Sequence, residues 1–259
     1  MADPRPILSV AIITLNEQQC IARCLQCIRF SEVFGKVEIV VVDAESRDRT
    51  ATIAGEYGAR VFVRPWPGYG EQRNWALQQC TGQWIMMLDA DEQLTPELVA
   101  EIERKLPAFS PDVDGCRIRW HDFYLGKWMK HGGWSPLQLR LVRNGAVHCT
   151  ITPVHEGLRV KGKCVQLDEA VNHYSYESIR DVLDKADRYS SLTVLALDDH
   201  RRRSWKLQML TAPLIEFVRM YIRGRGFLDG WHGFVAAAMS GFHQFLVYAK
   251  VWERDVLNL

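Results

Sequence analysis

The sequence has almost no excess of charge of either sign, and it contains no internal repeat or low-complexity tract. Lysine and arginine total 32 against 31 acidic residues, which gives a formal net charge of +1. A balanced chain creates no global field that would recruit nucleic acid, so we expect no nucleic-acid partner. With 259 residues, of which 47% are apolar and 24% charged, the chain is able to bury a full hydrophobic core.

The beginning of the chain also lacks the features of a secretory signal. Residues 1–6 carry an acid and a base, with no apolar run behind a positively charged segment. The seven cysteines form an odd, scattered set, which favours reduced thiols over a disulfide framework. We therefore expect a cytoplasmic protein.

The first half of the chain alternates short β-rich runs with segments long enough for helices. Strands are expected over Ile7–Ile13, Val37–Val42, Arg60–Val63 and Trp84–Leu88, and helices over Glu17–Arg29, Asp48–Tyr57, Glu71–Gln79 and Pro96–Leu106. Thr95 before Pro96 is a good helix start, because threonine caps free N–H groups and proline fits the first turn. The alternation predicts an α/β fold with a mainly parallel sheet covered on both faces.

The rhythm changes after about Gly115. Strands are expected over Arg117–Trp120 and Leu137–Val142, and the aromatic, glycine-containing stretch between them should shape a pocket. From Ser178 onward, apolar residues recur at helical spacing, which predicts a helical C-terminal extension.

Polar residues follow three of the expected strands, at the edge where ligands bind in open parallel sheets. They are Thr14–Glu17, Asp43–Thr50 and Asp89–Glu92. Acids and hydroxyls also cap helices routinely, so each of these segments taken alone is a weak signal.

Asp89 and Asp91 carry the strongest signal of this kind. Alternate residues of an extended chain point the same way, and two carboxylates held together repel unless a cation lies between them. A divalent ion that bridges a diphosphate, Mg²⁺ or Mn²⁺, is the economical occupant. The alternative is that both are solvated acids ahead of the helix that starts at Pro96.

These motifs resemble those of the nucleotide-sugar-dependent inverting glycosyltransferases of family 2, which have the GT-A fold. The likeness covers residues 7–106 and rests on Val10–Glu17, on Val40–Asp43 with the polar residues after it, and on Asp89–Asp91. It implies that Asp43 recognises uracil or ribose, Asp89 the ribose and Asp91 the metal, and the segment from Gly68 to Asn74 resembles one that lines the nucleotide site. The expected donor-site residues are Thr14, Asn16, Glu17, Asp43, Ser46, Gln72, Arg73, Asn74, Asp89, Ala90 and Asp91, with Asp89 and Asp91 as ligands of Mg²⁺ or Mn²⁺.

A narrower likeness covers most of the chain. Four segments are similar to the lipopolysaccharide core β-1,4-glucosyltransferases: Thr152–Glu156, His173–Ser175, Gly226–Gly230 and Tyr248–Lys250. The likeness implies transfer of a hexose, with glucose as first choice, from a UDP-sugar to a lipid-linked saccharide such as the lipopolysaccharide inner core. A family 2 transfer to another cell-envelope glycan is the alternative. The corresponding division is a GT-A catalytic domain, residues 1–172, with a nucleotide-sugar half (1–115) and an acceptor half (116–172), followed by the helical extension, residues 173–259.

An inverting transfer by direct displacement needs a base that takes the proton of the acceptor hydroxyl. Glu156 is our first choice, because it follows the pocket-building region and lies in the subgroup-like pair with His155. Many family members carry two acids in the corresponding region, which leaves Glu92 and Asp122 as alternatives. The structural alternative for Glu156 is an ordinary ion-pair residue. His155 and His173 could bind metal or phosphate, although a lone histidine is more often simply hydrogen-bonded.

Cys20, Cys24 and Cys27 have the spacing of a radical S-adenosylmethionine iron–sulfur motif. Intervals of four and three residues also place all three thiols on one stripe of an expected helix, and we favour this structural interpretation. A dinucleotide oxidoreductase is disfavoured, because Arg73 stands where the third glycine of that motif should be.

The C-terminal region suggests a membrane partner. Arg201–Arg225 contains seven basic residues and one acid, Glu216, interleaved with large apolar residues, which is typical of a helix on an anionic membrane surface. An ordinary helix pair packed on the catalytic domain is the alternative. Gly230–Ala249 has no formal charge but is interrupted by polar residues, so we expect a peripheral platform on the inner face of the cytoplasmic membrane, without a spanning helix.

Overall fold

The computed structural model describes residues 5–134, 136–150, 157–198 and 202–257. The chain forms two compact units. The first, called the sheet unit here, comprises Met1–Trp120 and Leu137–His173, and the second, the helical unit, comprises His121–Pro136 and Tyr174–Leu259. The aromatic stretch after Trp120 therefore groups with the C-terminal helices.

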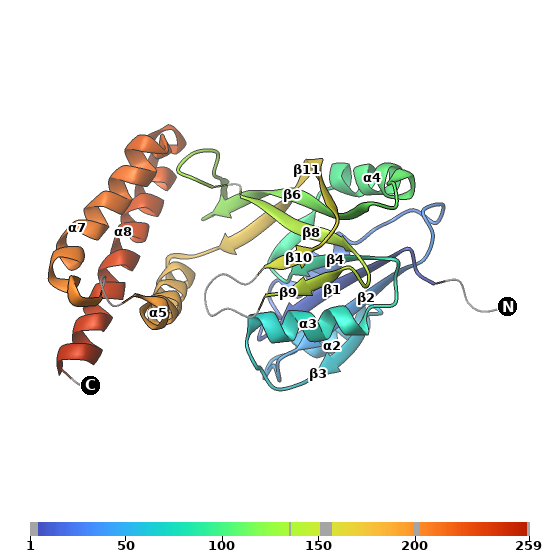
Figure 1. The fold of residues 1–259 in the computed structure, drawn as a ribbon, viewed down its shortest axis with the longest axis horizontal. Helices are drawn as coiled ribbons and strands as arrows, with labels where there is room; N and C mark the ends of the chain where they lie inside the picture. The colour runs from blue at the N-terminus through green and yellow to red at the C-terminus, as the bar shows by residue number, and fades with distance from the viewer. Residues whose placement is uncertain (1–4, 135, 151–156, 199–201, 258–259) are drawn as a thin grey trace. The chain divides into compact units, whose positions relative to one another are not determined.

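The first four strands of the sheet unit are parallel and lie in the order β3-β2-β1-β4 (Figure 1). Their bounds are Leu8–Thr14 (β1), Val37–Asp43 (β2), Arg60–Val63 (β3) and Trp84–Asp89 (β4). Every residue of β1 is buried, as a near-continuous apolar run in a sheet covered on both faces requires. The predicted α/β architecture is confirmed, and its strands begin and end within a residue of the expected bounds.

Helices follow these strands, with bounds Ile21–Gln26 (α1), Thr50–Glu56 (α2), Tyr69–Gln79 (α3) and Pro96–Lys105 (α4), and a short 3₁₀ turn, Leu106–Ala108, extends the last one. The hydroxyl of Thr95 accepts the backbone N–H of Leu98 at 3.1 Å, so α4 begins at the predicted cap. The first helix is shorter than expected. The backbone N–H of Glu17 donates to Thr50 Oγ1 and that of Gln18 to Asp48, so residues after β1 belong to the loop instead of the helix.

The sheet continues with antiparallel strands. The remaining bounds are Glu92–Leu94 (β5), Val113–Tyr124 (β6), Lys127–Trp128 (β7), Leu137–Arg143 (β8), Val147–Cys149 (β9), Leu158–Val160 (β10) and Lys163–Tyr176 (β11). The full order is β3-β2-β1-β4-β8-β6-β11-β5, with β7 paired to β6, while β9 and β10 form a separate hairpin. The pairings β4 with β8, β6 with β8 and β5 with β11 are antiparallel.

The link between β4 and β5 shapes the site. Only Ala90 and Asp91 separate the two strands in sequence, yet β8, β6 and β11 lie between them in the sheet. A two-residue link cannot span three intervening strands, which are each about 4.8 Å apart, unless the sheet curls so that its far edge returns to β4. Asp91 therefore sits where the curled sheet closes.

Side-chain alternation along β1 builds a core on each face of the sheet. Leu8, Val10 and Ile12 pack in one cluster with apolar residues of α1 and α4. Ala11 and Ile13 pack in the other with residues of α3. The two clusters hold the carboxyl ends of the parallel strands in fixed positions, which is the condition for a precise site.

The helical unit contains α5 (Ile179–Ala196), α7 (Trp205–Phe217) and α8 (Gly230–Trp252), with α7 and α8 side by side (Figure 1). Shorter turns complete it: the π-helical segments Val218–Arg223 and Glu253–Leu257, and the 3₁₀ turn Gly226–Asp229. A capping box of Ser178 and Asp181 starts α5. Gly241 permits the close approach of α7 and α8, since a Cβ there would lie 2.8 Å from the carbonyl oxygen of Pro213.

Helix α7 is apolar but unburied. None of its residues is buried, and Leu207, Leu210 and Leu214 are 63–73% exposed. Together with Val218 and Ile222 of the next turn, which are also exposed, these leucines form what we call the α7 apolar face. Among the described helices, none combines the length and the apolar character that a membrane crossing requires.

Candidate active site at the carboxyl ends of the parallel strands

Asp43 ties the loops that follow β1 and β2. Its buried carboxylate accepts hydrogen bonds from the Thr14 hydroxyl at 2.9 Å, from the Ser46 hydroxyl at 2.5 Å and from the Ser46 backbone N–H at 2.8 Å. A carboxylate with three donors is held in one orientation. The sequence-predicted residues Thr14, Asp43 and Ser46 are thus brought together.

Asn16 and Glu17 lie in the same loop pair. Asn16 has a left-handed backbone with φ of 58°, a conformation that asparagine tolerates better than most residues. Its backbone N–H donates to Ser46 Oγ at 2.7 Å, and its side-chain oxygen accepts the N–H of Arg47 at 2.9 Å. The backbone N–H of Glu17 donates to Thr50 Oγ1 at 2.8 Å. These hydrogen bonds hold the two loops in place at the ends of β1 and β2.

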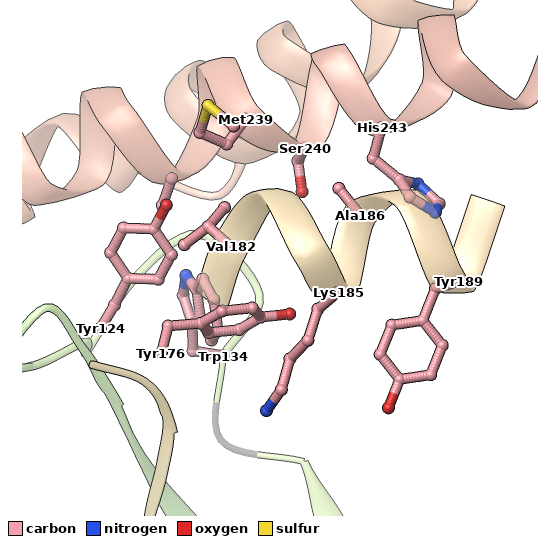
Figure 2. A pocket seen from close by; sticks show the side chains of 11 residues that line it. Tyr124, Trp134, Tyr176, Val182, Lys185, Ala186, Tyr189, Met239, Ser240 and His243 are labelled. Carbon is pink, nitrogen blue, oxygen red and sulfur yellow. The ribbon is translucent and has the colours of Figure 1, made fainter. Parts of the chain in front are cut away.

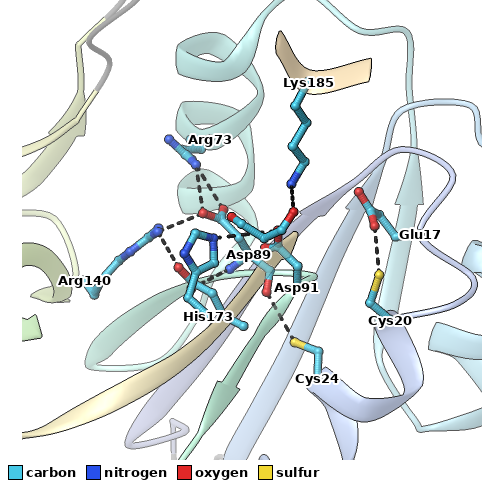
Figure 3. Close-up of polar contacts among 11 residues, drawn as sticks. Glu17, Cys20, Cys24, Arg73, Asp89, Asp91, Arg140, His173 and Lys185 are labelled. Carbon is cyan, nitrogen blue, oxygen red and sulfur yellow. Dashed lines mark hydrogen bonds and ion pairs between the residues drawn. The ribbon is translucent and has the colours of Figure 1, made fainter. Parts of the chain in front are cut away.

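Asp89, the last residue of β4, lies between two guanidinium groups (Figure 3). Nη2 of Arg140 is 2.8 Å from Asp89 Oδ2, and Nη2 of Arg73 is 3.0 Å from Oδ1. Burial by itself would raise the pKa of Asp89, but the charges of Arg140 and Arg73 outweigh it and hold that pKa well below its usual range. Asp89 is therefore a carboxylate at every physiological pH.

Glu92, the first residue of β5 directly after the two-residue link, is fully buried. Its Oε1 accepts Nη2 of Arg140 at 2.7 Å, and its Oε2 accepts the backbone N–H of Asp89 at 2.9 Å. Burial raises the pKa of Glu92 to about 7; Arg140 opposes this shift and the neighbouring charge of Asp89 adds to it. The structure thus pushes the pKa values of two neighbouring carboxyl groups in opposite directions.

Trp120 orients the cation that serves both acids. The Arg140 guanidinium lies 4.7 Å from the Trp120 ring centroid, and the His173 ring lies 4.4 Å from it on a tilted stack. His173 Nε2 is 3.7 Å from Asp91 Oδ2. Sequence reasoning missed Arg140, although a charged residue inside the apolar run of β8 is the signal that could have revealed it.

The donor set around Asp91 fits a metal ion that arrives with its own ligands. The cations that neutralise Asp89 are Arg73 and Arg140, whereas Asp91 faces the imidazole of His173. Over the residues that the structure describes, no group of three or more His, Cys, Asp or Glu side chains could hold a metal. One carboxylate and one imidazole suffice only where phosphate oxygens and water complete the shell, as Mg²⁺ commonly requires.

The three expected residues of α3 have different surroundings. Arg73 reaches Asp89, as described above. Gln72 is fully buried, and neither polar atom of its side chain has a hydrogen-bond partner within the described residues. Asn74 exchanges two hydrogen bonds with the backbone of Cys149, at 2.7 and 2.8 Å, and so fastens β9 to the helix. Ala90, in the β4–β5 link, is buried.

The candidate bases are spread over the chain. Glu156 and His155 lie outside the described residues. Glu92 has the enclosed position given above. Asp122, a buried residue of β6 within the helical unit, accepts the backbone N–H of Met129 through its carbonyl oxygen at 2.9 Å.

Two of the three clustered cysteines, Cys24 and Cys27, are packed into the core. Cys24 is fully buried and its thiol donates to the carbonyl oxygen of Asp89 at 3.5 Å, while Cys27 Sγ accepts the backbone N–H of Leu94 at 3.0 Å. Burial raises the pKa of Cys24 and raises that of Cys27 to about 11. Both are therefore protonated thiols near neutral pH.

Four parallel strands followed by antiparallel ones, with acidic side chains at the carboxyl end of β4, are the arrangement of the GT-A fold. The chain belongs to glycosyl transferase family 2, whose pattern it matches over residues 9–158. This membership confirms the resemblance drawn from the sequence, and it leaves the radical-enzyme alternative without support.

Relatives and a solved structure agree with this assignment. The chain is 29% identical to the lipopolysaccharide core biosynthesis glycosyltransferase LpsC of Rhizobium meliloti, over 98% of this chain and 95% of that protein. It is 31% identical to an uncharacterized glycosyltransferase of Rickettsia typhi, over 95% of this chain and 87% of that protein. Residues 1–349 of S. aureus TarS, crystallised with UDP-GlcNAc, share the fold with a TM-score of 0.51 and 15% identity, over 97% of this chain and 92% of that one.

Proposed function

We propose that this glycosyltransferase moves a hexose, with glucose as first choice, from a UDP-sugar to a lipid-linked saccharide such as the lipopolysaccharide inner core. The observation that carries the proposal is the acidic end of β4, where Asp89 is held ionised between Arg73 and Arg140 beside Asp91. The likeness to LpsC supports the choice of acceptor. Transfer to another cell-envelope glycan remains the second candidate, because the choice of acceptor depends on the name of one relative.

In this proposal the loops after β1 and β2 hold the nucleoside. Asp43 is the group for the uracil or ribose, and Thr14 and Ser46 keep its carboxylate in place. Asp89, which stays ionised, accepts a hydrogen bond from a ribose hydroxyl. Arg73 and Arg140 fix the orientation of Asp89, and their charge also lowers the local negative potential that a diphosphate meets.

Asp91, supported by His173, is our choice for holding Mg²⁺ or Mn²⁺. Such an ion would neutralise the departing diphosphate, and it would take its other ligands from phosphate oxygens and water. Asp89 is less suited to metal binding, because both of its oxygens already accept guanidinium groups. We therefore assign the metal to Asp91 and the sugar moiety of the nucleotide to Asp89.

We retain Glu156 as the base that takes the proton of the acceptor hydroxyl. The surroundings of Glu92 favour this choice by elimination, since Glu92 is fully buried and both of its oxygens accept hydrogen bonds. A proton acceptor has to reach the acceptor hydroxyl directly or through one water. Asp122 is the remaining alternative.

The membrane is our proposed setting for the acceptor. The α7 apolar face is flanked by exposed cations at both ends, Arg203 and Lys206 before it and Arg223 and Arg225 after it. An exposed apolar stripe with cations at its ends fits the headgroup boundary of an anionic leaflet, where long basic side chains reach back to the lipid phosphates. A second copy would bring like charges together, which disfavours it as the partner. Peripheral binding to the inner face of the cytoplasmic membrane is the resulting proposal.

Calorimetry with UDP tests the donor site. UDP should bind when Mn²⁺ or Mg²⁺ is present and should lose most of its affinity when a chelator removes the ion. The ion would join the protein to the diphosphate, whose oxygens supply the ligands that Asp91 and His173 do not. Asp91→Asn should remove the metal dependence, whereas Asp168→Asn, a matched change of an exposed carboxylate on β11, should leave it intact. Equal UDP affinity with metal and with chelator would contradict the metal assignment. A screen of nucleotide sugars for slow hydrolysis, read as free nucleotide, identifies the donor.

A further inference from the structure

Helix α8 has an exposed aromatic side. It carries five large aromatic residues that are 39–80% exposed, which we call the α8 aromatic stripe: Trp231, Phe234, Phe242, Phe245 and Trp252. Their spacing follows the period of 3.6 residues per turn, so they lie on one face of the helix. Soluble proteins rarely expose a contiguous apolar patch of this kind unless a partner covers it. The stripe is therefore a candidate interaction surface.

Another side of α8 is occupied within the helical unit. Figure 2 shows Ser240 and His243 pointing from α8 toward α5, where they line a small pocket. Lys250, the one charged residue of α8, donates to the carbonyl oxygen and to the carboxylate of Asp187 on α5, at 2.6 and 2.7 Å. The only charge of α8 is thus tied to its neighbour, and none lies in the stripe.

The α8 aromatic stripe lies beside the α7 apolar face. The ring centroid of Phe234 is 5.8 Å from that of Phe217 and 5.8 Å from that of Tyr221. Phe217 follows Leu214 of the α7 apolar face by three residues, and residues at that spacing are neighbours on a helix surface. The two helices therefore present one continuous apolar surface.

Cations border this surface, and the one acid near it is paired. Lys206, Arg223 and Arg225 are exposed at the two ends of the α7 apolar face. Glu216 is the only acid between residues 205 and 228, and its carboxylate accepts Nε and Nη2 of Arg219 at 2.8 and 2.5 Å. An apolar surface with cations at its border complements an anionic lipid leaflet.

Tryptophan stands at both ends of the stripe. Trp231 and Trp252 lie near the two ends of this 23-residue helix, about 30 Å apart along its axis. Indole rings favour the boundary between lipid head groups and acyl chains, because they combine an apolar body with one N–H donor. Both rings reach one such boundary together only if the helix lies parallel to it.

We propose that the α7–α8 hairpin lies flat on an anionic lipid leaflet. The α8 aromatic stripe and the α7 apolar face then lie together at the boundary between head groups and acyl chains. The inference rests on the proposed function in one respect, that the protein works at a membrane. It adds a second helix to the contact and fixes the orientation of the hairpin, which suits an acceptor whose lipid part stays in the bilayer.

Tryptophan fluorescence of the full chain tests the orientation, with anionic vesicles whose acyl chains carry bromine as the quencher. Trp231→Phe and Trp252→Phe should both still co-sediment with the vesicles, because phenylalanine keeps the apolar surface. Each should remove a similar share of the quenched intensity, since a flat helix places both rings at the same depth. Trp84→Phe is the control: Trp84 is buried in the sheet unit, and its loss should leave the quenched intensity unchanged.

Serine variants test the contact itself. Phe245→Ser and Trp231→Ser should each weaken co-sedimentation with anionic vesicles about tenfold, because each removes apolar area from the contact. Val33→Ser, a change at a 98% exposed residue of the sheet unit, should have no effect. The unfolding midpoint of each variant shows that it is folded, and the 80% exposed Trp231 is the site where folding is least affected.

The outcomes separate this inference from the proposed function. Loss of quenching in only one of the two phenylalanine variants would mean that one end of the hairpin inserts, and it would overturn the flat orientation. Vesicle binding that both serine variants leave unchanged would overturn contact through α8 and keep the membrane setting. Absence of vesicle binding by the wild type would overturn the membrane setting itself, and this inference with it.

Discussion

Arg140 holds two acidic side chains of the site in place. It is buried, and its Nη2 is the cation for both Asp89 and Glu92, at 2.8 and 2.7 Å. Removing one partner of a buried ion pair leaves an uncompensated charge in a poorly solvated place. The geometry of Asp89 and Glu92 therefore depends on a residue of β8, which sequence motifs do not mark.

We expect Arg140→Met to lower the free energy of unfolding by about 3–5 kcal/mol, because the buried carboxylate of Glu92 loses its guanidinium partner and Asp89 keeps only Arg73. Glu92→Gln added to this variant should recover part of the loss, since a neutral amide needs no counter-ion. Urea denaturation measures both. Arg60→Met is the control: its pair with Glu38, at 2.7 Å, involves a half-exposed arginine, and its loss should cost about 1 kcal/mol or less.

Substitution of Glu156 tests the proposed catalytic base. Glu156→Gln should bind UDP normally and transfer sugar about 10²–10⁴-fold more slowly, which is the usual contribution of a positioned proton acceptor. Glu92→Gln and Asp122→Asn, assayed in parallel, decide among the alternatives. Whichever variant combines intact UDP binding with collapsed transfer identifies the base, and a near-normal rate for Glu156→Gln would reject our choice.

The sequence indicated which acids gather, but not how their charge is balanced. Repulsion between Asp89 and Asp91 predicted a divalent cation, and the geometry supplies guanidinium groups to Asp89 from α3 and β8. Arg140 lies 51 residues after Asp89, so its proximity comes from strand pairing that no local pattern encodes. Thr14, Asp43 and Ser46 were easier to predict, because they follow adjacent parallel strands.

The four parallel strands were also predictable, because each is a short β-rich run between turn signals. Short elements were not predictable from the sequence. The strand β5 has only three residues and exists as a strand because it pairs with β11, far along the chain. The first helix was predicted too long, since apolar spacing gave no sign that Asp48 and Thr50 would capture the backbone of the preceding loop.

Helix α4 is joined to β11 by Glu101. The buried carboxylate of Glu101 accepts the backbone N–H groups of Asp168 and Glu169, both at 2.9 Å, and Lys105 Nζ at 2.5 Å. Burial alone would raise the pKa of Glu101, but these donors outweigh it and lower that pKa below its usual value. The stabilisation is therefore present above the pKa of the unfolded chain, about 4.3, and is lost as the pH falls through that range.

We expect Glu101→Gln to lower the free energy of unfolding by about 1–3 kcal/mol at pH 7, because the amide cannot accept all of these hydrogen bonds. The difference from the wild type should shrink near pH 4, where the wild-type carboxylate begins to take up a proton. Urea denaturation at both pH values measures it. Glu97→Gln, an exposed change on the same helix, should stay within about 0.5 kcal/mol, and an unchanged gap at pH 4 would contradict the assignment.

Binding of the whole molecule to membranes should have two components. The α7 apolar face contributes burial that salt does not screen, and the flanking arginines contribute about 1 kcal/mol each, which salt weakens. Co-sedimentation with anionic vesicles should therefore fall with salt but not vanish. Leu210→Ser should weaken it about tenfold, and changing Arg223 and Arg225 to glutamine should remove much of its salt dependence.

Leu195→Ser is the matched control for the membrane test, because Leu195 is 64% exposed on α5 and outside the α7 apolar face. Vesicle binding that survives Leu210→Ser unchanged would refute the docking surface. Sedimentation velocity covers the remaining case. A dimer that Leu210→Ser converts to a monomer, with vesicle binding unaffected, would assign the face to a second copy of the chain.

The two-residue link between β4 and β5 also sets an order of events while the protein is being made. A ribosome completes β4, Asp91 and β5 early, but β11, the neighbour of β5 in the sheet, emerges only with residues 163–176. Arg140 and His173 likewise arrive late. Closing so long a loop is a slow step, and until it happens β5 is an unpaired edge. The proposed donor site therefore cannot assemble until the chain has been made up to the end of β11 at residue 176, about two-thirds of its 259 residues.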